Sequence, residues 1–184
     1  MLTAWGDESG SQPERDPGSY LIAAALIDED DVSTVRKTMD GLLLSSETKV
    51  HWHRRSDDHR SELIAAVAEL PVCSLVVVHH DTAASDRRHR RKCLEYLLPH
   101  LADMPCASIT LESRGPMDQS DLDILQKFRA RKLVQGELRI RHERGRVDPV
   151  LSVPDVVCGA VVQARVGNHT YLDALGDLVD IRSL

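Results

Sequence analysis

Apolar segments alternate with amphipathic ones along the chain, and this alternation predicts an α/β protein. The first apolar segment runs into Asp7, and a second one, at 20–27, follows after a short connection. Runs rich in Val, Ile and Leu predict further buried strands at 72–79 and 107–112. Apolar residues at helical spacing predict the helices, which we place at 32–43, 57–70, 86–101, 118–133, 154–165 and 173–178.

Two shorter segments have weaker strand patterns. In Lys49–His53, a period of two would place Lys49, His51 and His53 on one face, and Leu138–His142 resembles an edge strand. The short connection between the first two strands predicts an antiparallel hairpin that opens a mixed β-sheet flanked by helices. Because no repeat or linker interrupts this pattern, residues 1–184 are expected to form a single domain.

Composition narrows the classes of function. The 184 residues are 42% hydrophobic and 28% charged, which is ordinary for a globular domain. The apolar runs are too short to cross a bilayer and the N-terminus has no signal-peptide pattern, so a cytoplasmic location without membrane contact is expected. The four cysteines are widely separated, which indicates neither a disulfide framework nor a thiolate zinc site.

Basic residues gather in two places, although the formal net charge is −6. One is the run Arg87–Lys92, and the other is a looser group around 139–146. Such a run is commonly a solvated helix face. The alternative is a strip that binds phosphate groups, for which the side chains of interest are Arg87, Arg88, Arg91 and Arg114.

Three acidic residues stand at corresponding places in the pattern. Asp7 ends the first strand, Glu112 ends a later strand, and Asp155 begins an apolar helix. Each has an ordinary alternative as a turn, strand-end or helix-cap residue. If they converge at one edge of the sheet, their mutual repulsion would be relieved by a hard divalent cation, which binds through oxygen ligands.

Other constellations are weaker. His51 and His53 could be half of a zinc site, but no third ligand is evident. His79 and the polar residues after it read as the exit from a buried strand. The chain has no phosphate-binding glycine loop, no dinucleotide fingerprint and no nucleophile elbow, so use of a nucleoside triphosphate is not expected.

The sequence resembles the bacterial and phage family known as domain of unknown function 3800. Members open with a strand that runs into Asp-Glu-Ser-Gly, which is Asp7–Gly10 here. They carry an acidic residue after a middle strand, matched by Glu112 although Asp is more common there, and they close with an Asp in a small-residue helix, matched by Asp155. The matches span residues 4–165.

This resemblance implies a ribonuclease H-like fold that uses Mg²⁺ or Mn²⁺ in phosphodiester hydrolysis. Asp7, Glu112 and Asp155 would then be both catalytic residues and metal ligands, and the accessory candidates are Glu8, Lys49, His51, Asp118 and Asp121. The expected function is that of a metal-dependent nuclease or phosphodiesterase acting on DNA or RNA. A non-catalytic module that binds nucleic acid or protein is the alternative, and hydrolysis of a small phosphoester is a third. The sequence leaves open whether the chain forms a homodimer.

Overall fold

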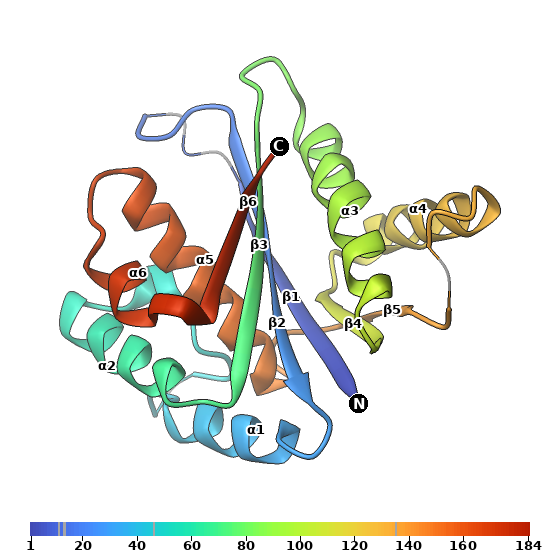
Figure 1. The fold of residues 1–184 in the computed structure, drawn as a ribbon. Coiled ribbons are helices and arrows are strands. Elements are labelled where there is room, and N and C mark those ends of the chain that lie inside the picture. The colour runs from blue at the N-terminus through green and yellow to red at the C-terminus, as the bar shows by residue number, and fades with distance from the viewer. Residues whose placement is uncertain (11, 13, 46, 135) are drawn as a thin grey trace.

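The computed structural model describes residues 1–184 except 11, 13, 46 and 135, and it contains one six-stranded sheet (Figure 1). The strand order is β5-β4-β1-β2-β3-β6. The strands are β1 (Leu2–Ser9), β2 (Ser19–Asp28), β3 (Val72–His80), β4 (Cys106–Glu112), β5 (Arg139–Glu143) and β6 (Val179–Ser183).

The sheet is mixed, as the pattern predicts. Strands β1 and β2 form the antiparallel opening hairpin, and β3 pairs with β2 in the same sense. On the other side, β4 runs parallel to β1 and β5 runs parallel to β4. Because β1 and β4 are parallel neighbours, their carboxyl ends lie at the same end of the sheet.

Helices cover both faces of the sheet (Figure 1). One face carries α1 (Val32–Gly41), α2 (Asp57–Ala68), α5 (Ser152–Arg165) and α6 (Thr170–Leu175), and the other carries α3 (Asp86–Asp103) and α4 (Asp118–Ala130). The central strand β2 supplies both cores, because successive side chains point to opposite faces. Leu21 and Ile27 pack under α5 and its neighbours, whereas Ile22 and Leu26 pack under α3 and α4.

The segment Lys49–His53 does not form the predicted strand. Its end lies in a single 3₁₀ turn, Trp52–Arg54, and Val50 and Trp52 are both buried. The Trp52 ring lies against Gly159 of α5 so closely that a side chain at Gly159 would overlap it. Docking on α5 therefore replaces pairing in the sheet, and the predicted face shared by Lys49, His51 and His53 is wrong.

Two further differences concern the ends of the chain. The first strand continues beyond Asp7, its predicted end, and reaches Ser9. Strand β6 has no clear alternation in sequence and is mostly exposed, yet it pairs in parallel with β3. The amide and carbonyl groups on the side that faces β3 are paired there, which a sequence pattern does not reveal.

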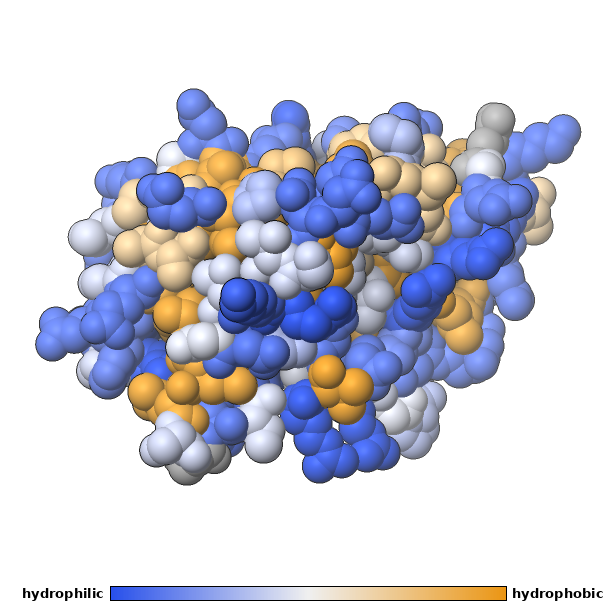
Figure 2. Space-filling view, turned by 90° about the horizontal axis from the view of Figure 1, so that it is seen from below, coloured by the Kyte–Doolittle hydropathy of each residue, from blue (hydrophilic) through white to orange (hydrophobic). Residues whose placement is uncertain are grey.

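Seen from below relative to Figure 1, the surface is mainly hydrophilic, with smaller hydrophobic areas between the polar residues (Figure 2). No helix in the described part of the chain is both long enough and apolar enough to cross a membrane.

Candidate active site

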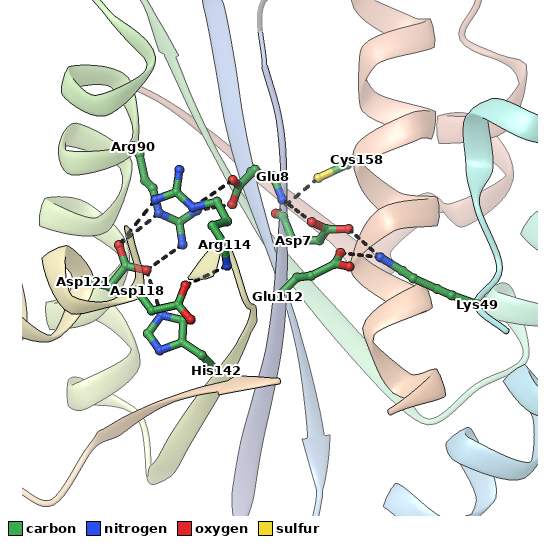
Figure 3. A network of polar contacts seen from close by, with 10 residues as sticks. All are labelled: Asp7, Glu8, Lys49, Arg90, Glu112, Arg114, Asp118, Asp121, His142 and Cys158. Atoms are coloured by element: carbon green, nitrogen blue, oxygen red, sulfur yellow. Dashed lines mark hydrogen bonds and ion pairs between the residues drawn. The ribbon is translucent and has the colours of Figure 1, made fainter. Parts of the chain in front are cut away.

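Strands β1 and β4 bring Asp7 and Glu112 together at their carboxyl ends. Asp7 is only 9% exposed, and its neighbour Glu8 points to the opposite face of the sheet because β1 is still extended there. Glu112 is the last residue of β4 and lies on the same side as Asp7 (Figure 3).

Lys49 joins these two carboxylates. Its Nζ donates to Asp7 Oδ2 at 3.3 Å and also contacts Glu112 Oε2 (Figure 3). The Lys49 side chain is almost fully buried, so the ammonium is held between the carboxylates rather than in solvent. An ion pair removed from water in this way requires close compensation of charge.

Helix α5 adds the third carboxylate. Asp155 lies in the first turn of α5, where its Oδ2 accepts a hydrogen bond from the Trp52 backbone N–H at 3.0 Å. One turn later, the Cys158 thiol lies 3.5 Å from the Asp7 carbonyl oxygen, so α5 packs directly on β1. The docked 3₁₀ turn thus holds Asp155 in place, and the same segment carries Lys49.

The pKa values reflect this crowding of negative charge. Burial raises the pKa of Asp7 to about 7; the Lys49 ammonium opposes this rise, and the charges of Asp155 and Glu112 add to it. Burial likewise raises the pKa of Asp155. Burial alone would lower the pKa of Lys49, but the three carboxylates raise it, so Lys49 stays charged.

The loop after β5 forms another side of this site. Gly145 is buried, and a Cβ atom placed on it would lie 2.5 Å from Glu112 Oε1 and 2.5 Å from Lys49 Cδ. Only a glycine lets the loop approach the ion pair this closely. The flanking residues Arg144 and Arg146 are both exposed.

A second polar network lies on the opposite face of the sheet. Arg90 is buried and binds Asp121 through two hydrogen bonds, 3.0 Å and 2.7 Å, and it also contacts Glu8. Arg114 Nε lies 3.3 Å from Glu8 Oε1, and His142 Nε2 lies 2.9 Å from Asp121 Oδ2 (Figure 3). Glu8 and Asp121 are therefore engaged with cations away from Asp7 and Lys49.

Of the remaining accessory candidates, Asp118 lies beside the network on the opposite face of the sheet and His51 lies near the carboxylate site. Asp118 accepts hydrogen bonds from Ser113 Oγ and from the Arg114 backbone N–H, so it orders the turn after β4. His51 lies near the carboxylates; burial lowers its pKa, and the charge of Lys49 lowers it further while Asp155 acts in the opposite sense. The arginines proposed for phosphate binding, Arg87, Arg88, Arg91 and Arg114, line a cavity between α3 and α4.

The donor set of this site suits a hard divalent cation, because Asp7, Glu112 and Asp155 all lie near the Lys49 ammonium, and burial disfavours the charge of Asp7 and of Asp155. Asp7, Glu112 and Asp155 are the residues that could hold such an ion. In the side-chain arrangement of the described residues, however, no three His, Cys, Asp or Glu side chains are placed to bind a metal. The Lys49 ammonium instead supplies the positive charge between Asp7 and Glu112.

Several of these contacts have no clear signal in the sequence. Arg90 stands in a run of basic residues, and nothing local distinguishes it as the buried member. The roles of Trp52 and Gly145 depend on segments that are distant in sequence. His142 could only have been suspected from its place on a strand next to β4, opposite Leu111.

No protein-family model and no curated protein matches the sequence. The fold, in contrast, is similar to those of solved ribonucleases H. Ribonuclease HII from Archaeoglobus fulgidus, solved in complex with PCNA, matches with a TM-score of 0.59 and 14% identity over 90% of this chain and 75% of that chain. Ribonuclease H2 from Pyrococcus horikoshii OT3 matches with a TM-score of 0.55 and 16% identity, over 95% of this chain and 75% of that chain.

A third neighbour is Bst-RNase HIII in complex with Mn²⁺, with a TM-score of 0.51 and 13% identity over 89% of this chain and 53% of that chain. At these identities the likeness establishes the fold. The chain therefore has a ribonuclease H-like fold, a mixed sheet flanked by helices that opens with an antiparallel hairpin.

Proposed function

We propose that the protein is a divalent-metal-dependent nuclease whose site is built on Asp7, Glu112 and Asp155. The observation that carries this proposal is the convergence of these three carboxylates around the buried Lys49 ammonium. The site lies at the carboxyl ends of β1 and β4, in a fold shared with ribonucleases HII and HIII. Membership of the family of domain of unknown function 3800 agrees with the same assignment and stays a prediction.

Bound Mg²⁺ or Mn²⁺ would polarise the scissile phosphodiester and lower the pKa of the attacking water. The chain's own groups would position that chemistry. Asp7, Glu112 and Asp155 would supply the oxygen ligands, and the orientation of Asp155 is fixed by the Trp52 N–H. Lys49, which contacts both Asp7 and Glu112, would offset negative charge on the phosphate.

Arg144 and Arg146 are suited to hold the substrate. They flank Gly145, which touches Glu112 and Lys49, and neither side chain forms an ion pair within the described residues. Exposed guanidinium groups next to a carboxylate site would bind the phosphates on either side of the scissile bond. The proposed substrate is therefore a nucleic acid strand, DNA or RNA.

The decisive experiment is cleavage of labelled DNA and RNA oligonucleotides with Mg²⁺, with Mn²⁺ and with EDTA. We expect cleavage that requires the metal and falls at least about a hundredfold in Asp7→Asn, because a ligand contributes no less than its supporting residues do. Asp177→Asn makes the same change on an exposed residue outside the site and should retain full activity. Unchanged cleavage in Asp7→Asn would contradict the proposed mechanism.

A non-catalytic nucleic-acid-binding module is the second candidate, and one observation favours it. Lys49 already compensates Asp7 and Glu112, and no metal-holding group is present in the residues that the structure describes. Calorimetric titration with Mg²⁺ separates the candidates. A nuclease should show binding that is lost in Asp155→Asn, whereas an inert module should show no carboxylate-dependent heat.

A further inference from the structure

The cavity between α3 and α4 lies on the opposite face of the sheet from Asp7 and has a volume of about 420 Å³. This volume falls within the range of small-ligand pockets, about 300–1,000 Å³. It is large enough for one unit of a chain molecule and too small for a folded partner. The cavity therefore has the size of a ligand-binding site, and it is separate from Asp7, Glu112 and Asp155.

The chemistry of its walls is strongly biased toward anions. Basic side chains outnumber acidic ones in the lining, which includes Arg87 and Arg88 of α3, Lys127 of α4, and Arg131, which follows α4. All four are exposed, and within the described chain none of them forms an ion pair. Such cations are available to a ligand, whereas Arg90 is already neutralised by Glu8 and Asp121.

Part of the cavity lining is apolar, and we call this part its floor. A small inorganic anion alone would leave these apolar groups without a partner. Met117, Ile124 and Phe128 contribute to its lining, so a ligand with both a phosphate and a flat apolar face would be complementary. Ser85, which precedes the first turn of α3, also lines the cavity, and the positive end of the helix dipole there favours a phosphate oxygen. A nucleotide has this combination of groups.

The cavity is connected to the carboxylate site through two side chains. Arg114 lines the cavity and follows Glu112 by two residues, and it contacts Glu8, the neighbour of Asp7. Arg114 and the carboxylate site therefore both lie at the carboxyl ends of β1 and β4 (Figure 3). A single flexible strand that crosses this end of the sheet can reach both.

We propose that the cavity between α3 and α4 binds a nucleotide of a single nucleic acid strand, away from the position of cleavage. The identification of the ligand as nucleic acid rests on the proposed function. The presence of the cavity, of its unpaired cations and of its apolar floor does not depend on that proposal. Binding there would anchor the strand while Asp7, Glu112 and Asp155 act on another phosphate.

The test is fluorescence anisotropy with labelled single-stranded oligonucleotides of about ten nucleotides, a length typical of such sites, measured in EDTA so that cleavage is absent. Arg88→Glu combined with Lys127→Glu removes one cation from each wall. We expect affinity to fall by about tenfold or more, and the salt dependence to decrease by about one phosphate contact for each residue. Lys37→Glu, made on exposed α1 across the sheet, is the control for charge and should bind as the wild type does.

A second variant leaves the charge unaltered. Ile124→Trp fills the apolar floor and should weaken oligonucleotide binding while the circular dichroism spectrum and Tm remain those of the wild type. Wild-type affinity in both Ile124→Trp and the double variant would overturn the proposal. Equal affinity for free adenosine monophosphate and for the oligonucleotide would also overturn it, because the site would then serve a small ligand.

The two proposals fail in different ways. If the cavity is not a strand site, the double variant binds and cleaves normally while Asp7→Asn still abolishes cleavage. If the nuclease assignment fails, no metal-dependent cleavage is found in any variant. Oligonucleotide binding would then still depend on Arg88 and Lys127.

Discussion

At the scale of single residues, one lysine and one arginine compensate the buried negative charge. Lys49 lies between Asp7 and Glu112 on one face of the sheet, and Arg90 lies between Glu8 and Asp121 on the other. The adjacent residues Asp7 and Glu8 thus enter different ion-pair networks because β1 alternates its side chains. The pKa of Asp7 rises to about 7, whereas that of Asp121 falls to about 2.

The low pKa of Asp121 gives a testable dependence of stability on pH. Burial alone would raise this pKa, but hydrogen bonds from His142 and Arg90 and the charges of Arg90 and Arg114 lower it from 3.8 to about 2. The ionised carboxylate therefore contributes stability that is fully present above about pH 4 and is lost as the pH falls toward 2. The shift corresponds to about 2 kcal/mol.

Urea unfolding of the wild type and of Asp121→Asn at several pH values measures this contribution. We expect the wild type to be more stable by about 2 kcal/mol at pH 7, and the difference to shrink below pH 4. Asp123→Asn, a change on an exposed neighbour in α4, is the control and should leave the curve unchanged. A difference that did not vary with pH would mean that the ion pairs of Asp121 do not carry the effect.

At the scale of elements, the site depends on how the 3₁₀ turn Trp52–Arg54 docks on α5. The Trp52 backbone orients Asp155, and its ring occupies the space left by the missing side chain of Gly159. The ring also meets Tyr171 of α6 edge-on, with centroids 5.0 Å apart. This packing is the reason that the segment carrying Lys49 reaches the carboxylates.

Gly159→Ala should therefore destabilise the protein although alanine favours helices. The added methyl group overlaps the Trp52 ring, and overpacking of this kind costs about 1–3 kcal/mol. Thermal unfolding should show a lower Tm, accompanied by a change in tryptophan fluorescence. Gly41→Ala, at the end of α1 where no atom would meet the new side chain, should be neutral or stabilising; an equal loss there would contradict the packing argument.

At the scale of the whole molecule, the candidate site collects five separate parts of the chain. Asp7 comes from β1, Lys49 from a loop, Glu112 from β4, Gly145 from the connection after β5, and Asp155 from α5. Long-range convergence of this kind requires that β4 pairs in register with β1 and that β5 pairs in register with β4.

Gly145→Ala tests this convergence without removing a charged group. The new Cβ would press on Glu112 and Lys49, so we expect Mg²⁺ affinity and cleavage to fall by about 10- to 100-fold, as for residues that support metal ligands. Stability should change little, because the displaced atoms are the ends of flexible side chains. Gly10→Ala, which meets no neighbouring atom, is the matched control. Wild-type cleavage in Gly145→Ala would mean that this loop does not shape the site.

Much of the fold follows from local patterns in the sequence. The apolar run of β2, the Val-rich β3 and the Leu spacing of α3 predict their elements because burial on both faces or on one stripe requires those residues. The pattern also places Asp7 and Glu112 near strand ends and Asp155 at a helix start, which confines these acids to the rims of the fold.

Tertiary structure alone decided the rest. Lys49–His53 has the alternation of a strand, but this segment docks on α5, where Trp52 is buried against Gly159. Strand β6 forms because β3 offers an open edge. The choice of Arg90 as the buried cation and of Lys49 as the partner of Asp7 depends on charges that are distant in sequence. Local sequence sets the periodicity of each element, whereas buried ion pairs form only when the complete fold brings opposite charges together away from water.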